Sequence, residues 1–260
     1  MKKTECGFCS GQLLPILTLG NMPIVNYFPS RSELAAEKKY PLELCVCGDC
    51  ELVQLGFIVP PQQIFRSYHF LTSASKPLVG HLQKLADLCR KEFRLDPRSR
   101  VLDIGCNDGS LLLEFKKRKI QTLGVEPATA VAQVAQRRGI RVIPEFFNGS
   151  LAKEIRNGDG QFDLLSATRV LANIADLNGF MNGVKLLLAP RGVFVAEVNS
   201  LSEMLSKFQF DAIYHEHYSY FSFASLQKIL KKHGLSIFKF EKSLFQGGEL
   251  RIFATHTAHV

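Results

Sequence analysis

The stretch Val101-Leu-Asp-Ile-Gly-Cys-Asn-Asp-Gly109 decides the fold, because it joins an apolar run to a glycine-containing loop and leads into an amphipathic segment from Ser110. Glycines in such a loop let the backbone approach a ligand closely, and the following helix offers free N–H groups at the positive end of its dipole. About twenty residues later, Leu123-Gly-Val-Glu126-Pro127 ends the next predicted strand with a carboxylate suited to two ribose hydroxyls. Strand, loop, helix and acidic residue therefore follow in the order of a nucleotide-binding α/β fold.

From residue 97 onward, apolar strands alternate with amphipathic helices in the way that builds parallel sheets. Strands are predicted at 100–104, 122–125, 140–143, 162–166, 192–198, 235–241 and 250–257. Helices are predicted at 110–119, 128–138, 151–156, 179–188 and 223–233. Two close strands around Gly247-Gly248 end this series. The pattern predicts a doubly wound α/β sheet of seven strands, of which the last is antiparallel.

The loop does not meet the dinucleotide fingerprint G-x-G-x-x-G, because Asn107 stands where its second glycine would be. The pattern D-x-G-x-x-x-G with a later glutamate instead resembles the S-adenosylmethionine (SAM) loop of class I methyltransferases. The resemblance implies a Rossmann-like, mostly parallel sheet in which the aspartate orients the loop and the glycine turn takes the amino-acid end of SAM. The cofactor-binding residues that it implies are Asp103, Gly105, Cys106, Asn107, Gly109, Glu126, Pro127 and Thr168.

Two C-x-x-C knuckles, Cys6-Gly-Phe-Cys9 and Cys47-Gly-Asp-Cys50, lie near the start of the chain. Each knuckle can place two thiolates on one metal, and two knuckles supply the four ligands of a tetrahedral zinc site. Cys45 could compete with Cys47, but only Cys47 keeps the two-residue gap to Cys50. Because four cysteines leave no open coordination position, the spacing predicts a structural zinc ion.

Cysteine content and apolar periodicity divide the chain into three predicted parts. Residues 1–61 are rich in cysteine, proline and loops, and they predict a small zinc-binding domain. Residues 62–96 predict a helical connector that contributes to the active site, since leucines recur at three- and four-residue steps from 78 to 88. Asp96-Pro97 ends the connector, because the residue before proline is disfavoured in a helix. Residues 97–260 form the predicted α/β domain.

Residues 210–222, Phe-Asp-Ala-Ile-Tyr-His-Glu-His-Tyr-Ser-Tyr-Phe-Ser, are dense in titratable and phenolic groups. They follow the fifth predicted strand, at the carboxyl edge where open α/β sheets bind ligands. The segment is not the H-E-x-x-H zinc motif, because His215 and His217 are two residues apart. In an extended segment both histidines share one face, whereas a tight turn would separate them. A purely structural role, with packed tyrosines and hydrogen-bonded histidines, is the alternative.

In combination, these motifs resemble the sugar-nucleotide C-methyltransferases. The two knuckles, D-I-G-C-N-D-G, G-V-E-P, Y-H-E-H-Y-S-Y-F-S and the late G-G-E-L-R occur in collinear order from Cys6 to about Phe253. These enzymes place a methyl branch on C3 of a 4-keto deoxysugar carried on a nucleotide diphosphate. The resemblance implies a zinc-binding domain followed by a SAM-dependent methyltransferase domain, with zinc and SAM as cofactors and a nucleotide-diphosphate sugar as partner.

The resemblance also implies enolate chemistry. His217 matches the base that removes the C3 proton, and an imidazole suits that task at neutral pH. Glu216 and Tyr214 match the residues that support this base, and Tyr68 matches a tyrosine that contacts the sugar. The enolate carbon would then attack the methyl group of SAM. Catalysis is therefore assigned to these four residues.

Two features depart from the family. Arg169-Val-Leu-Ala-Asn173 stands where the family usually has asparagine and, four residues later, histidine, whose side chains face the reacting sugar. Arg169 could bind a diphosphate or a carboxylate, and Asn173 can form hydrogen bonds but cannot act as a base. The family's C-terminal domain, which helps hold the sugar nucleotide, has no predicted counterpart here. An altered substrate, a reduced activity and a decayed enzyme are all compatible with these departures.

The composition constrains partners and compartment. Thirty-two Lys and Arg residues against 24 Asp and Glu give a formal net charge of +8, which favours an anionic partner. An rRNA-type methyltransferase with a zinc ribbon is an alternative, but the basic residues are scattered and no N-P-P-Y-type base-flipping motif is present. No apolar run reaches the ~18 residues of a membrane span, and no signal-peptide cleavage site is evident. The sequence predicts a cytoplasmic protein and does not indicate its oligomeric state.

Overall fold

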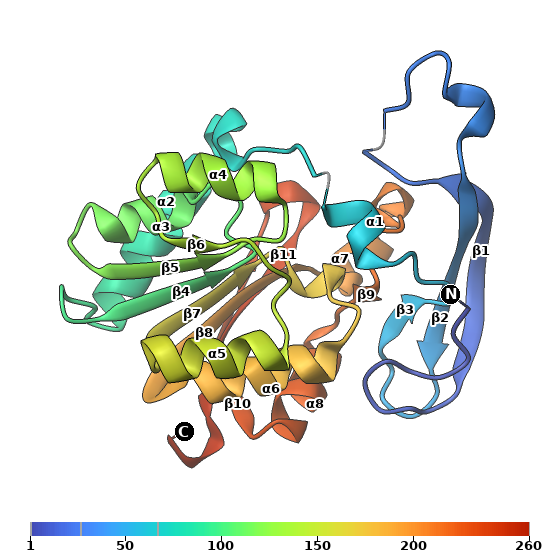
Figure 1. Ribbon diagram of the computed structural model, residues 1–260. Coiled ribbons are helices and arrows are strands. Elements are labelled where there is room, and N and C mark those ends of the chain that lie inside the picture. Colours follow the sequence, from blue (N-terminus) through green and yellow to red (C-terminus); the bar gives the residue numbers. More distant parts are fainter. Residues whose placement is uncertain (1, 27, 67, 260) are drawn as a thin grey trace.

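The computed structural model describes residues 2–26, 28–66 and 68–259, which form a large α/β sheet and a small antiparallel sheet (Figure 1). The large sheet has the strand order β10-β11-β8-β7-β4-β5-β6. Its strands are β4 (Arg100–Ile104), β5 (Gln121–Val125), β6 (Val142–Ile143), β7 (Phe162–Thr168), β8 (Leu188–Asn199), β10 (Leu235–Ser243) and β11 (Glu249–His256). β11 runs antiparallel to both its neighbours, whereas β4 to β8 are parallel. The predicted seven-stranded, mostly parallel sheet with an antiparallel last strand is confirmed.

Some strand bounds differ from the prediction. The strand expected at 140–143 is reduced to Val142–Ile143 at the edge of the sheet. The strand expected at 192–198 begins at Leu188, which pairs with Phe162 before a register shift. Proline and glycine at 190 and 192 are strand breakers in sequence terms, but the irregular pairing lets the strand continue through them.

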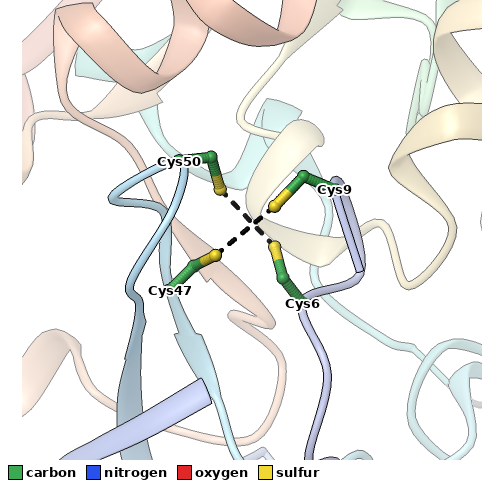
Figure 2. A group of neighbouring side chains, drawn as sticks. All are labelled: Cys6, Cys9, Cys47 and Cys50. Carbon is green, nitrogen blue, oxygen red and sulfur yellow. Dashed lines mark hydrogen bonds between the residues drawn. The ribbon is translucent and has the colours of Figure 1, made fainter. Parts of the chain in front are cut away.

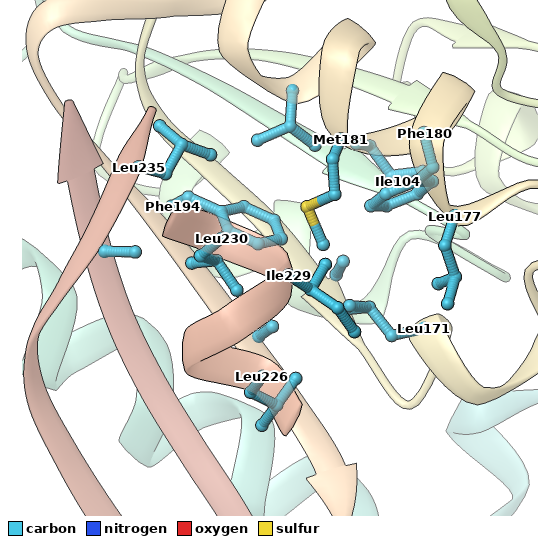
Figure 3. Packing of buried hydrophobic residues seen from close by; sticks show 14 of the residues in the cluster. Ile104, Leu171, Leu177, Phe180, Met181, Phe194, Leu226, Ile229, Leu230 and Leu235 are labelled. Carbon is cyan, nitrogen blue, oxygen red and sulfur yellow. The ribbon is translucent and has the colours of Figure 1, made fainter. Parts of the chain in front are cut away.

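Helices cover both faces of the large sheet (Figure 1). One face is covered by α2 (Lys76–Glu92), α3 (Ser110–Lys116) and α4 (Thr129–Arg137). The other face is covered by α5 (Gly149–Asp159), α6 (Leu177–Leu187) and α8 (Phe223–Lys232). Figure 3 shows Met181 of α6 and Ile229 of α8 facing Phe194 of β8, and all three are almost fully buried. Each such side chain stabilises the fold by roughly 1.5–3 kcal/mol relative to exposure.

The small sheet has the order β1-β2-β3-β9 and consists of β1 (Leu13–Pro23), β2 (Lys39–Cys47), β3 (Val53–Leu55) and β9 (Ser219–Tyr220). Three strands come from the cysteine-rich segment, but β9 comes from the histidine-containing segment of the α/β domain. Val53 pairs with Tyr220, and Gln54 pairs with Ser219. This pairing was not predicted, and it attaches the segment with His217 to the zinc-binding part of the chain.

The sequence predicted a helical connector from residue 62 onward, but the connector consists of separate helical elements. A short helix α1 (Pro61–Phe65) and a single 3₁₀ turn η2 (Thr72–Ala74) precede α2. Ser75 begins α2 because its hydroxyl accepts the N–H of Leu78, and this cap stops the helix from extending backward. The remaining helical elements are α7 (Leu201–Ser206), η1 (Leu34–Ala36), η3 (Leu171–Asn173), η4 (Phe210–Ala212), η5 (Phe245–Gly247) and η6 (Thr257–His259). Among the described residues, no helix has the length and apolar character needed to cross a membrane.

Candidate active site and metal centre

The four cysteines of the two knuckles face one another (Figure 2). Cys6 Sγ lies 3.6 Å from Cys50 Sγ. Cys9 Sγ lies 3.4 Å from Cys47 Sγ. Tetrahedral zinc with Zn–S bonds of ~2.3 Å places its sulfurs about 3.8 Å apart, so this donor set fits the ion. Cys45 is outside the group, which leaves a four-cysteine centre of the structural type.

The first knuckle is anchored to the α/β domain. Gln54 Nε2 donates to Cys6 Sγ at 3.1 Å, and hydrogen bonds of this kind orient and stabilise a metal-ligating thiolate. The carbonyl oxygen of Phe8 accepts hydrogen bonds from Asn178 of α6 at 2.9 Å and from Lys232 of α8 at 2.8 Å. The metal centre therefore joins the small sheet to the helices of the large one.

A cavity of about 210 Å³ lies at the carboxyl ends of β4, β5 and β7. The strand order leads from β4 to β5 on one side and to β7 on the other, which makes this edge the usual ligand site of an open α/β sheet. Seven of the eight predicted cofactor residues line the cavity: Asp103, Gly105, Cys106, Asn107, Glu126, Pro127 and Thr168. Gly109 lies before α3 with a φ of +75°, where a Cβ atom would come within 3.1 Å of Ile140. Glycine is therefore required there by backbone geometry and packing.

Two carboxyl groups give the cavity its polar character. Glu126 accepts the backbone N–H groups of Asn107 at 3.0 Å and of Ala128 at 2.9 Å, which fixes its orientation. Burial raises the pKa of Glu126 above its ordinary value. Asp103 is more deeply buried and accepts the hydroxyl of Ser166 at 2.7 Å, and burial raises its pKa to about 7. Both groups can accept hydrogen bonds from a cofactor's hydroxyl or amino groups.

The loop after β4 also holds the connector over the cavity. Asn107 Oδ1 accepts the N–H of Thr72 at 2.8 Å, and its Nδ2 donates to the carbonyl of Phe70 at 2.9 Å. Asp108 accepts the N–H of Ser73 at 2.8 Å. Asn107 has a φ of +50°, in a region that asparagine tolerates better than most residues. The side chains of this loop thus bind the connector, whereas its backbone and Glu126 remain at the cavity.

A second cavity, of about 230 Å³, adjoins the first. The two cavities share five lining residues: Tyr68, Phe70, Leu78, Arg169 and Asn173. The second cavity is further lined by Tyr214, Glu216 and His217, and by Asn199 and Gln246. The four residues assigned to catalysis therefore meet at a cavity next to the predicted cofactor cavity.

His217 has a defined tautomer. Its Nδ1 lies 3.0 Å from the carbonyl oxygen of Ala212, which can only accept, so Nδ1 carries the proton. Its Nε2 lies 2.8 Å from the hydroxyl of Tyr214 and therefore accepts from it. Burial lowers the pKa of His217 to about 4, so the imidazole is neutral at pH 7 with its lone pair on Nε2. This arrangement suits a general base.

The segment around His217 is a tight turn and not an extended strand. The N–H of His217 bonds to the carbonyl of Tyr214 at 3.0 Å, which brings these two rings together. His215 lies elsewhere, with Nε2 3.3 Å from the carbonyl of Tyr40. Of the two geometries considered for this segment, the structure has the tight turn, which separates the two histidines.

Glu216 and Tyr68 complete this group. Glu216 Oε1 accepts from Asn26 Nδ2 at 2.9 Å, and burial raises the pKa of Glu216. Burial, together with the charges of Glu216 and Glu126, raises the pKa of Tyr68 to about 12, so this phenol keeps its proton at neutral pH. Both tyrosines at this cavity are hence hydrogen-bond donors, since burial also raises the pKa of Tyr214.

A second group of potential metal ligands consists of His81, Glu197 and Glu249. Each of the two carboxylates in this group already forms an ion pair with an arginine. Arg251 Nε donates to Glu197 at 2.7 Å, and Arg169 Nε donates to Glu249 at 2.6 Å. Because the arginines compensate the negative charge, this group is an ion-pair network and does not require a cation.

Comparisons with known proteins agree with this geometry. Residues 79–239 match the family model described as "Methyltransferase domain", and residues 6–65 match the one described as "Putative zinc binding domain". The chain belongs to the SAM-dependent methyltransferases. The segment that matches the zinc-binding model precedes the segment that matches the methyltransferase model, as the order of motifs predicted.

The methyltransferase is similar to curated proteins over different lengths. It is 34% identical over 256 residues to the C-methyltransferase NovU of Streptomyces niveus. The matched region covers 98% of this chain and 61% of NovU. It is 29% identical over 133 residues to a ubiquinone biosynthesis O-methyltransferase of Azorhizobium caulinodans. This matched region covers 47% of this chain and 51% of that protein. The chain thus spans between half and two thirds of the length of these relatives.

Solved structures share the fold of this methyltransferase. Magnesium protoporphyrin IX methyltransferase (ChlM) from Synechocystis PCC 6803 with bound SAH has a TM-score of 0.53 at 16% identity, with 69% of this chain and 84% of that chain covered. The PH0226 protein from Pyrococcus horikoshii OT3 has a TM-score of 0.57 at 15% identity, with 77% and 100% covered. At these identities the likeness concerns the fold alone.

The sequence analysis did not identify several residues of the site. Asn199 ends β8 at the same sheet edge as the other site residues, so its position after a predicted strand was an available signal. Gln246 lies in the turn next to the G-G-E-L-R motif. Asn26 gave no signal, because it reaches Glu216 from a loop 190 residues away in the sequence.

Proposed function

We propose that the protein is a SAM-dependent C-methyltransferase that acts on a nucleotide-linked 4-keto deoxysugar. One observation carries the proposal: the unprotonated Nε2 of His217 lies at a cavity that adjoins the predicted SAM cavity. Methylation of a carbon atom next to a ketone through an enolate requires a base that removes the proton from that carbon. The similarity to NovU over nearly the whole chain supports carbon as the methyl acceptor.

In the proposed reaction, the C4 ketone acidifies the proton on C3, and Nε2 of His217 removes it. The electron pair of the C–H bond forms a C=C bond, and the carbonyl π electrons move to oxygen to give an enolate. The enolate carbon then attacks the methyl group, the C–S bond breaks, and its electrons return to sulfur. Base catalysis contributes about 10²–10⁴-fold, so alignment of the two substrates has to supply much of the remaining acceleration.

The phenol of Tyr214 donates a hydrogen bond to Nε2 of His217. Substrate binding has to displace this hydroxyl before Nε2 can reach a C–H proton. The freed O–H, together with that of Tyr68, can then donate to substrate oxygens, since both phenols stay protonated. Glu216 supports this group through its charge and its hydrogen bond with Asn26.

The proposed cofactor is SAM, which supplies the transferable methyl group. Asp103, Gly105, Cys106, Asn107, Gly109, Glu126, Pro127 and Thr168 are assigned to its binding, with the carboxylate of Glu126 on the ribose hydroxyls. Zinc in the four-cysteine centre is proposed to be structural. We assign residues 1–61 to the zinc-binding domain, 62–96 to the connector and 97–260 to the methyltransferase domain.

The test is incubation of the purified protein with SAM and a nucleotide-diphosphate 4-keto deoxysugar. Mass spectrometry should detect one added methyl group on the sugar, and NMR should place it on C3. A second readout, incorporation of solvent deuterium at C3 without SAM, reports proton removal alone. Absence of both reactions over a panel of keto sugars, with SAM binding intact, would refute the proposal.

A further inference from the structure

Arg169 lies where the two cavities meet and lines both. It directly follows β7 and has a φ of +58°, a conformation that costs a residue with a Cβ atom about 1 kcal/mol or more. Its backbone N–H donates to the carbonyl of Glu197 at 2.8 Å, which stabilises this conformation. Backbone strain of this kind persists where surrounding contacts enforce it, and it is common at ligand-binding sites.

The guanidinium group of Arg169 is held from two sides. Nε and Nη2 donate to the two carboxylate oxygens of Glu249, at 2.6 and 3.2 Å. The guanidinium carbon lies 4.7 Å from the centre of the Phe245 ring. The side chain of Glu249 is fully buried, and that of Arg169 is only 20% exposed. Such a two-sided arrangement fixes the group before any substrate binds.

Two polar atoms at the cavities, one donor and one acceptor, are left for a ligand. Nη1 of Arg169 forms no hydrogen bond with any residue that the structure describes. Asn173, which also lines both cavities, has a buried Oδ1 atom without a hydrogen-bond partner in the described part of the chain. Buried polar atoms are seldom left unpaired, so the unpaired Oδ1 of Asn173 next to both cavities indicates a polar ligand.

The ion pair with Glu249 restricts which acceptor fits. Because Glu249 already compensates the charge of Arg169, a substrate carboxylate would place a second anion beside a buried one. A carbonyl oxygen is neutral in the substrate and gains charge only as the adjacent carbon loses its proton. A fixed donor aimed at such an oxygen stabilises the transition state more than the ground state.

We propose that Arg169 is a further catalytic residue, which donates hydrogen bonds to the carbonyl oxygen next to the reacting carbon and stabilises the enolate formed by His217. This inference rests on the proposed function. The position is consistent with the role, because the reacting carbon has to be within reach of both the methyl donor in one cavity and His217 in the other. The carbonyl bonded to that carbon would then lie where Arg169 lines both cavities. When the enolate carbon is methylated, the electrons return to reform the C=O bond and the hydrogen bonds weaken.

The test measures solvent deuterium incorporation at C3 of the keto sugar, without SAM, for the double variant Arg169→Gln/Glu249→Gln. The double variant removes both charges together, so no unpaired charge is left buried, and a thermal melt verifies its fold. The control is Arg98→Gln, whose side chain is 92% exposed, and it should exchange at the wild-type rate. Loss of one oxyanion donor typically costs about 10²–10³-fold, so we expect a fall of at least about 10²-fold in the double variant.

Four results separate the possible outcomes. A folded double variant that exchanges C3 deuterium about 10²-fold slower, with SAM affinity within a few-fold of wild type, supports the role. A double variant with wild-type exchange overturns it, and a large loss of SAM affinity in that variant would make Arg169 a cofactor ligand instead. Failure of the wild-type protein to exchange or methylate any keto sugar refutes the proposed function, and this inference with it.

Discussion

The hydroxyl of Tyr214 lies 2.8 Å from Nε2 of His217, and the centres of their rings are 4.1 Å apart. A four-residue turn from Tyr214 to His217 produces this pair, so the sequence spacing of the two residues determines that they can meet. The phenol O–H donates to the lone pair on Nε2 of His217, which the proposed reaction uses to accept a proton. A substrate therefore has to replace the phenol at Nε2 before His217 can remove a proton from it.

Replacing His217 with asparagine should abolish most catalysis. The amide retains hydrogen-bonding capacity but cannot accept the C3 proton at neutral pH. We expect methyl transfer and C3 deuterium exchange to fall about 10²–10⁴-fold, with SAM affinity unchanged by calorimetry. His259→Asn, at an exposed position, is the matched control. Equal C3 exchange rates for wild type and His217→Asn would remove His217 as the base.

The stability of the protein should depend on pH through His217. Burial lowers the pKa of His217 to about 4, whereas an unfolded chain has ~6.5. The folded state then binds fewer protons than the unfolded state between these values, so stability is present above about pH 6.5 and is lost as the pH falls toward 4. Urea unfolding at about pH 7.5 and pH 5 should show wild type losing ~2 kcal/mol more than His217→Asn. Identical losses would mean that His217 titrates normally.

Glu126 should contribute to SAM affinity. The variant Glu126→Gln keeps a carbonyl oxygen but loses the negative charge, which weakens hydrogen bonds to two ribose hydroxyls by about 1–2 kcal/mol in total. Calorimetry should therefore show roughly tenfold weaker SAM binding. The control Glu145→Gln alters an exposed carboxylate beyond the cavity lining and should bind as wild type does. Unchanged affinity of Glu126→Gln would exclude the ribose contact.

Zinc should be required for catalysis more than for SAM binding. The variant Cys9→Ser removes one of the four ligands and should lower zinc content, measured by plasma emission spectrometry, from about one equivalent per chain. The pairing of β3 with β9 ties the His217 segment to the metal-bound sheet, so methyl transfer should fall further than SAM affinity. Cys45→Ser, outside the metal group, should keep its zinc. Full zinc content in Cys9→Ser would contradict the four-cysteine assignment.

Local patterns were sufficient for the large sheet and the metal centre. The predicted strand at 100–104 has the same bounds in the structure, because strands buried on both faces are continuous apolar runs between turn residues. The four metal ligands follow from two fixed spacings within short loops. Edge strands and the connector were predicted less well, since pairing and caps there depend on neighbours outside the local sequence.

The sequence by itself determined the order of motifs, the strand-loop-helix unit at 101–110, the two knuckles and the residue types available for catalysis. Tertiary packing alone shows that β9 completes the small sheet beside the four cysteines, that Asn26 binds Glu216 and that Arg169 pairs with Glu249 across 80 residues of sequence. The reason is that propensity, capping and ligand spacing act over a few residues, so they are readable from the chain. Contacts between distant segments depend on how whole layers pack, and packing is a property of the folded molecule.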